Sequence, residues 1–152
     1  MPRLAATVAT LALLVATGTA AAPVEAQTRE GKYAQQAFAA TNVKRAQNNL
    51  PALRANKCLR RAAVRQATRM AQQEQMFHQD LGAVLGECHL TAAGENVAAG
   101  YPNGTSVVNN GWMTSEGHRE NILNSSFTLM GVGARKGHDG EWYVAQVFGR
   151  KA

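Results

Sequence analysis

The chain has 152 residues, of which 45% are hydrophobic and 17% charged, and it contains two cysteines. This length predicts a single packed domain behind a leader segment and argues against a multidomain enzyme. The formal net charge of +6 favours anionic partners. Nucleic acid is not expected among them, because the basic stretches lack interleaved aromatic residues and the chain looks exported.

The N-terminal segment has the organisation of a secretory signal peptide. A short basic start precedes an uncharged run over residues 4–24, and small residues suited to cleavage lie at 20–22 and 24–26. An uncleaved membrane anchor is the alternative interpretation. We therefore expect a secreted, extracellular and monomeric protein with a signal peptide over 1–26 and one domain over 27–152.

Helical periodicity marks two segments after the leader. Residues 30–48 carry apolar and small side chains at helical spacing and end at an NNLP turn, which predicts a first helix. Asn56 is a suitable N-cap for a second helix that reaches about residue 75. Its apolar face should consist of Leu59, Ala63, Ala67 and Met70.

The second predicted helix also carries a basic face. Arg61, Arg65 and Arg69 recur every fourth residue, and residues 44–69 contain no acid. The simpler interpretation is a solvated surface. The alternative is attraction to an anionic envelope surface, such as wall polymers or lipid headgroups.

Cys58 and Cys88 are the only cysteines of the chain. In an exported protein an even pair favours a disulfide, and two free buried thiols are the alternative. A disulfide that closes a loop of about 30 residues would stabilise the fold by about 3–4 kcal/mol.

The middle of the chain is harder to interpret. Glycine and proline punctuate residues 78–104, which predicts a loop-rich stretch. A third helix should follow, capped by Thr105 or Ser106 and running through Trp112.

Two strand patterns end the chain. Residues 129–135 and 141–149 flank the turn signal GHDG, so they predict an antiparallel hairpin. The last strand is apolar on both of its faces and therefore needs cover on both sides. Together the elements predict an α+β fold, a three-layer α-β-α sandwich with a small, mostly antiparallel sheet.

Two histidines and one acid stand out as candidate site residues. His78 lies in the motif FHQD, and Glu95 is an acid in an apolar, small-residue run, where it needs a partner if it is buried. Ser115 is a suitable N-cap for a short helix that carries His118 in its first turn. The macrodipole at that position should lower the pKa of His118 and keep the ring neutral, the form that binds metals and accepts protons.

The motifs FHQD, GENVAAG, GWMTSEGHRENIL, FTLMGVGA and EWYVAQVFG occur in this order. Together they resemble the CAP superfamily, or SCP domain, which includes cysteine-rich secretory proteins, insect antigen 5 and plant pathogenesis-related class-1 proteins. The likeness covers nearly all of residues 35–149 and is greatest to short, secreted bacterial members. The α-β-α fold of that family agrees with the fold expected from the strand pattern.

The resemblance implies a central cavity formed by two histidines and two acids. His78 and His118 match the two histidines, and Glu95 matches the acid of the GEN motif. The second acid of the family lies three residues after a tryptophan, and Ser115 occupies that position after Trp112. The tetrad is therefore reduced to a triad, which weakens any mechanism that needs two carboxylates. The expected ligand cavity comprises His78, Glu95, Asn96, Trp112, Ser115 and His118.

Three roles are open to the triad of His78, Glu95 and His118. Glu95 can orient the histidines in a purely structural network, the three groups can hold zinc or another divalent metal as cofactor, or they can act as catalytic residues of a hydrolase. We expect a non-catalytic extracellular binding module for a lipid, sterol-like or cell-wall-derived ligand. A metal- or His/Glu-dependent hydrolase of peptide or ester bonds is the alternative, and a purely electrostatic surface binder is a third hypothesis.

Overall fold

The computed structural model describes residues 28–152. The expected signal peptide, residues 1–26, lies outside the described residues. Within the described part, no helix combines the length and the apolar character needed to cross a membrane.

The described chain forms five α-helices and a four-stranded sheet. The strands lie in the order β1-β3-β4-β2, where β1 runs parallel to β3 and the other neighbours are antiparallel. In chain order the elements are α1 (Arg29–Gln47), β1 (Arg54–Ala55), α2 (Lys57–Gln73), α3 (Leu81–Cys88), β2 (Ala92–Ala99), α4 (Gly104–Ser106), α5 (Glu116–Leu123), β3 (Leu129–Lys136) and β4 (Trp142–Arg150).

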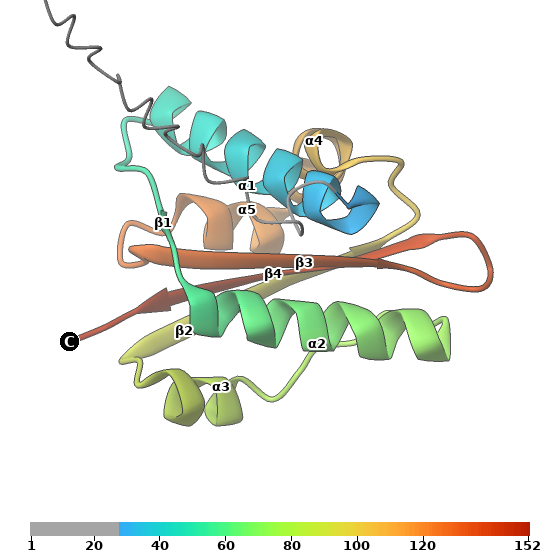
Figure 1. The fold of residues 1–152 in the computed structure, drawn as a ribbon. Helices are drawn as coiled ribbons and strands as arrows, with labels where there is room; N and C mark the ends of the chain where they lie inside the picture. The colour runs from blue at the N-terminus through green and yellow to red at the C-terminus, as the bar shows by residue number, and fades with distance from the viewer. Residues whose placement is uncertain (1–27) are drawn as a thin grey trace, which may run out of the picture.

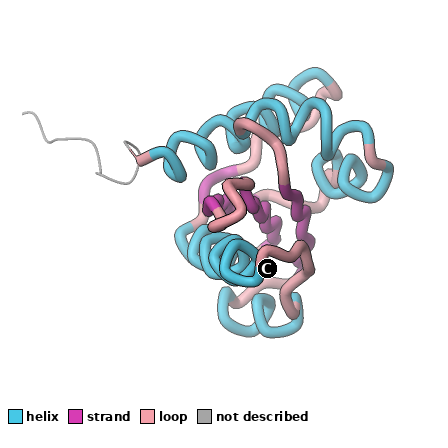
Figure 2. The backbone as a smooth tube through the Cα atoms, turned by 90° about the vertical axis from the view of Figure 1, so that its right-hand side faces the viewer, coloured by secondary structure: helices cyan, strands magenta, loops and turns pink. Residues whose placement is uncertain are grey.

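The sheet lies between two helical layers. Helices α1, α4 and α5 cover one face, and α2 and α3 cover the other (Figure 1); a view turned by 90° again shows the strands between helices (Figure 2). Alternate side chains of β4 enter two separate cores: Val144 and Phe148 pack toward α1, whereas Ala145 and Val147 pack toward α2. The predicted α+β three-layer sandwich is confirmed.

Side-chain caps fix the starts of the two long helices. The Thr28 hydroxyl accepts a hydrogen bond from the Gly31 amide at 2.9 Å, and the Asn56 side chain accepts one from the Leu59 amide at 3.0 Å. The predicted helix over 30–48 is therefore correct to within one residue. The predicted apolar face of α2 is also correct, because Leu59, Ala63, Ala67 and Met70 are all fully buried.

Two glycines let α2 lie directly against the sheet. A Cβ added at Gly131 would fall 2.2 Å from the Arg60 nitrogen, and one added at Gly133 would fall 2.4 Å from the Val64 nitrogen. The β3 pattern of apolar residues alternating with glycine thus has a packing cause. Its apolar residues face α1, and its glycines admit the backbone of α2.

The predicted loop-rich stretch over 78–104 was wrong in two places, because it contains α3 and β2. The Asp80 carboxylate caps α3 by accepting hydrogen bonds from the Gly82 and Ala83 amides. Strand β2 pairs with β4 along its whole length. Its alanines and glycine have low intrinsic strand propensity, so tertiary pairing rather than local preference makes this segment a strand.

The cap of the third helix was also wrong. Asn103, and neither Thr105 nor Ser106, caps α4, with its side-chain oxygen accepting from the Ser106 amide at 2.9 Å. The helix continues as a π-helical turn over Val107–Gly111 and a 3-10 turn over Trp112–Thr114.

The disulfide between Cys58 and Cys88 is present. It joins the first turn of α2 to the last residue of α3, so it fastens the outer helix of that layer to the helix that packs on the sheet. The disulfide prediction is confirmed, and the alternative of two free thiols is excluded.

Candidate functional site

The predicted acid and the first predicted histidine meet as a hydrogen-bonded pair. The Nδ1 atom of His78 lies 2.8 Å from Oε2 of Glu95. The Glu95 side chain is fully buried on β2, whereas the His78 side chain, in the connection between α2 and α3, is 59% exposed. Because an ionised carboxylate only accepts hydrogen bonds, Nδ1 carries the proton, and Nε2 of a neutral His78 keeps its lone pair.

Gln79 completes the environment of this carboxylate. Its amide nitrogen donates to Oε2 of Glu95 at 3.1 Å, and its side-chain Nε2 donates to Oε1 at 2.6 Å. Three donors therefore hold the Glu95 side chain in place. Sequence reasoning missed Gln79, and the one available signal was its position directly after His78.

His118 lies in the first turn of α5 and is half-buried. Burial lowers its pKa, and the neighbouring charge of His78 lowers it further. The predicted direction of the shift in the His118 pKa is confirmed. Ser115 occupies the expected N-cap position, yet its side chain makes no capping hydrogen bond.

A buried chain of amides connects this helix to the sheet. The Asn96 side chain donates to the His118 carbonyl at 3.1 Å and to Oε1 of Gln146 at 3.1 Å. Asn121 donates to Oδ1 of Asn96 at 3.0 Å and to the Glu95 carbonyl at 3.1 Å. The network fixes α5, and with it His118, relative to the strand that carries Glu95.

The six residues of the predicted cavity differ in accessibility. Glu95, Asn96 and Trp112 are buried, and the Trp112 indole donates to the Val97 carbonyl at 3.2 Å within the core. These three side chains support the site from below. Direct contact with a ligand is open to the more accessible residues, His78, Ser115 and His118.

The arrangement does not fit a resident three-ligand metal centre. Zinc sites in proteins use three or four side-chain ligands. Among residues 28–152, no three His, Cys, Asp or Glu side chains are grouped so that they could hold a metal ion. The oxygens of Glu95, the predicted third ligand, already accept three hydrogen bonds.

Comparison with known proteins identifies the family. The family model of the cysteine-rich secretory protein family, CAP, matches residues 38–148. This chain belongs to the CAP family. The match covers the candidate site and both helical layers, and the expected resemblance is confirmed.

Relatives of this CAP domain occur in bacteria. The protein YkwD of Bacillus subtilis (strain 168) is 35% identical over 109 residues, covering 66% of this chain and 42% of YkwD. An extracellular protein containing a SCP domain from Bacillus anthracis str. Ames has the same fold, with a TM-score of 0.72 at 32% identity, covering 88% of this chain and 45% of that one. The chain thus spans less than half the length of these relatives.

A cysteine-rich secretory protein from Staphylococcus aureus subsp. aureus Mu50 shares the fold at lower identity. The TM-score is 0.68 at 21% identity, and the match covers 81% of this chain and 40% of that one. At that identity the similarity concerns the fold alone.

Only part of the predicted basic face of the CAP domain is free of partners within the protein. Arg65 forms an ion pair with Glu87 of α3 at 2.5 Å, and Arg69 donates to the side-chain oxygen of Gln66. Of the three arginines that the helical spacing singled out, Arg61 alone has no such partner among the described residues.

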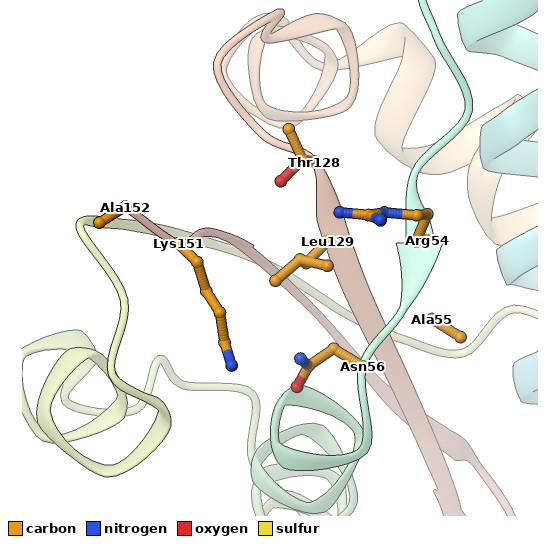
Figure 3. Close-up of a pocket in the computed structure, with 7 residues that line it drawn as sticks. All are labelled: Arg54, Ala55, Asn56, Thr128, Leu129, Lys151 and Ala152. Carbon is orange, nitrogen blue, oxygen red and sulfur yellow. The ribbon is translucent and has the colours of Figure 1, made fainter.

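A hollow of about 350 Å³ lies at the β1 edge of the CAP domain (Figure 3). None of the predicted cavity residues lines it. The residues that do are Arg54, Ala55, Asn56, Thr128, Leu129, Lys151 and Ala152. A smaller hollow of about 100 Å³ lies between the end of α2 and the β3–β4 turn, and it too excludes the predicted cavity residues.

Proposed function

We propose that this CAP domain is a secreted, non-catalytic binding module whose ligand contacts the surface formed by His78, Ser115 and His118. The observation that carries the proposal is the buried carboxylate of Glu95, which accepts three hydrogen bonds. Its oxygens accept hydrogen bonds from His78 and twice from Gln79, and its side chain is fully buried. A carboxylate in this state orients an imidazole and does not reach a substrate.

The surroundings of His118 also favour binding over hydrolysis. A general base that activates a serine must lie within hydrogen-bond reach of the hydroxyl. In the part of the chain that the structure describes, the Ser115 hydroxyl makes no hydrogen bond to His118. Ser115 is therefore not prepared as a nucleophile, and a hydrolase that uses this serine has no support from the geometry.

A wall-derived ligand suits this surface better than a lipid or sterol-like ligand. Its accessible groups are two imidazoles and a hydroxyl, which recognise hydroxyl and amide groups by hydrogen bonding. An apolar ligand needs a concave, predominantly apolar pocket. Neither described hollow lies at these residues.

Export is part of the proposal. The signal-peptide pattern over 1–26 and the disulfide both suit a protein that functions outside the cytoplasm. The relative from Bacillus anthracis is described as extracellular.

The test is a thermal-shift and calorimetric titration of the secreted protein with soluble peptidoglycan fragments as the probe. A ligand that binds only the native state raises the melting temperature, by an amount that grows with its concentration. We expect this rise for the wild type and its loss in the double variant His78→Ala with His118→Ala. The matched control is His138→Ala, which removes an exposed histidine from the β3–β4 turn.

Two outcomes would overturn the proposal. One is the absence of any shift in the wild type with the peptidoglycan fragments. The other is turnover of a peptide or ester substrate by the wild type that His118→Ala abolishes while the fold survives, since this would establish the hydrolase instead.

A further inference from the structure

The hollow at the β1 edge is lined by two basic side chains and by no Asp or Glu side chain. Three chain segments build this region, over residues 51–61, 124–131 and 148–152, and none of them contains Asp or Glu. Arg54 and Lys151 line the hollow from opposite sides (Figure 3). The segments are far apart in the sequence, so folding creates this concentration of charge.

The hollow faces solvent, and its lining combines polar with apolar surface. Besides the two cations, Asn56 and Thr128 direct an amide and a hydroxyl toward it, and both groups can donate to an anionic oxygen (Figure 3). Its volume of about 350 Å³ is sufficient for a small anionic group with part of the chain that carries it.

These cations are not used to hold the fold together. Across residues 28–152, no ion pair or side-chain hydrogen bond engages Arg54, Lys57, Arg61 or Lys151, in contrast to Arg65 and its partner Glu87. Lys57 and Arg61 also stand in the first two turns of α2, whose first turn has no acid, where positive charge opposes the helix dipole. Because these positions of Lys57 and Arg61 do not favour the stability of the fold, they point to a functional reason for the two cations.

We propose that this surface, formed by Arg54, Lys57, Arg61 and Lys151, binds a phosphodiester-linked polyol polymer of the cell envelope, with one phosphate seated in the hollow. Guanidinium and ammonium groups pair with phosphate oxygens through charge-assisted hydrogen bonds. Lys57 and Arg61, one helical turn apart, continue the positive charge along α2 and meet the neighbouring phosphates. The proposal is independent of the surface around His78 and His118.

Two other polyanions fit the surface less well. A nucleic acid would require aromatic side chains on which bases stack, and none of the residues that line the hollow is aromatic. A membrane would favour apolar side chains that insert beside the cations. The exposed large hydrophobic residues of the described chain are Val43 and Met76, and neither lines the hollow.

The experiment is a binding titration of the secreted protein with a synthetic poly(glycerol phosphate) oligomer at several salt concentrations. We expect the double variant Arg54→Gln with Lys151→Gln to bind at least about tenfold more weakly. The slope of the logarithm of the binding constant against the logarithm of the salt concentration should become shallower by about 0.7–1 for each cation removed. The control is Arg29→Gln with Lys32→Gln, which removes the same two charges from α1. We expect this control to bind within about twofold of the wild type, since distant exposed charges are screened.

Each other outcome overturns the proposal. If both double variants lose affinity equally, net charge and not this surface determines binding. If oligothymidylate or phosphatidylglycerol vesicles bind as tightly as the oligomer, the occupant is a different polyanion. If the wild type does not bind the oligomer even at low salt, the surface has no such ligand.

Two further measurements keep the result interpretable. The melting temperatures of all variants should agree, because the substituted side chains are exposed; should the double variant unfold, Arg61→Gln alone provides the same comparison. The His78→Ala with His118→Ala protein should bind the oligomer normally, so that a failure of this proposal is distinguishable from a failure of the proposed function.

Discussion

The two faces of the sheet are built on different principles. On the face under α2, Gly133 of β3 lies against the helix backbone at Ala63, and Gly131 likewise brings the helix and strand backbones together. The opposite face, under α1 and α5, buries polar groups such as Arg45, Asn96 and Gln146. Close backbone packing predominates on the first face, although Gln66 of α2 is also buried there, and hydrogen-bond partners predominate on the second. The candidate site lies at the edge strand β2, where both kinds of packing meet.

The largest effect should come from filling the glycine contact. We expect Gly131→Val to destabilise the fold by about 4–5 kcal/mol, because the new side chain meets the backbone of α2, which cannot rotate away. Urea unfolding measures the change. Gly86→Ala is the control, since a Cβ there meets no atom within 4 Å; this substitution within α3 should instead stabilise the protein by about 0.5–1 kcal/mol. Equal effects at the two positions would contradict the role given to the contact.

The second largest effect should come from removing the disulfide, which lies on the same side of the sheet as α2. Replacing both Cys58 and Cys88 by serine should lower the free energy of unfolding by about 3–4 kcal/mol, because the unfolded chain gains the entropy of a loop of about 30 residues. Chemical reduction of the wild type should give the same unfolding curve as the double variant. A stability unchanged by either treatment would show that packing alone holds α3.

The polar face is tested by its buried guanidinium. Arg45 donates to the carbonyls of Pro51, Ile122 and Asn124 at 2.8–2.9 Å and is 1% exposed. Arg45→Met fills the same space but leaves these carbonyls without donors, so we expect a loss of about 2–3 kcal/mol in urea unfolding. Arg45→Lys should recover only part of the loss, because one ammonium cannot reach all three carbonyls. Full stability in the Met variant would mean that volume governs this face as well.

The smallest effect concerns pH and His118. Its pKa in the folded protein lies below the ordinary value of 6.5, so the unfolded chain binds more protons as the pH falls through this region. His118 therefore reduces stability progressively below about pH 6.5, until the folded-state pKa is passed. Urea unfolding between about pH 7.5 and 5 should show a weaker dependence for His118→Gln than for the wild type. Parallel curves for the two proteins would contradict the shift.

Sequence reasoning predicted much of the sheet face that α2 covers. Asn56 as a cap, Leu59 and Met70 as buried residues, and the doubly apolar β4 all follow from periodicity, which is a local signal. The polar face has no such signal. Nothing in the sequence indicates that Gln146 would donate to Thr41 of α1 at 2.7 Å, because that pairing exists only after the chain has folded.

At the candidate site, too, some features were predicted from the sequence and others depend on the folded structure. The pairing of His78 with Glu95 was among the expected roles, since a buried acid needs a partner. The contribution of Gln79 and the engagement of Arg65 by Glu87 were not expected, because each depends on where α3 packs. As α3 was itself taken for a loop, the basic surface could be delimited only from the structure.

The disulfide also has a consequence for a protein that meets proteases. Residues 72–76, which include the last two residues of α2, are exposed and lie between the two bridged cysteines, a short distance before His78. A single cut there leaves both fragments covalently joined, so the nicked chain migrates as two pieces only after reduction. Cleavage at this exposed turn therefore need not separate the two halves of the molecule.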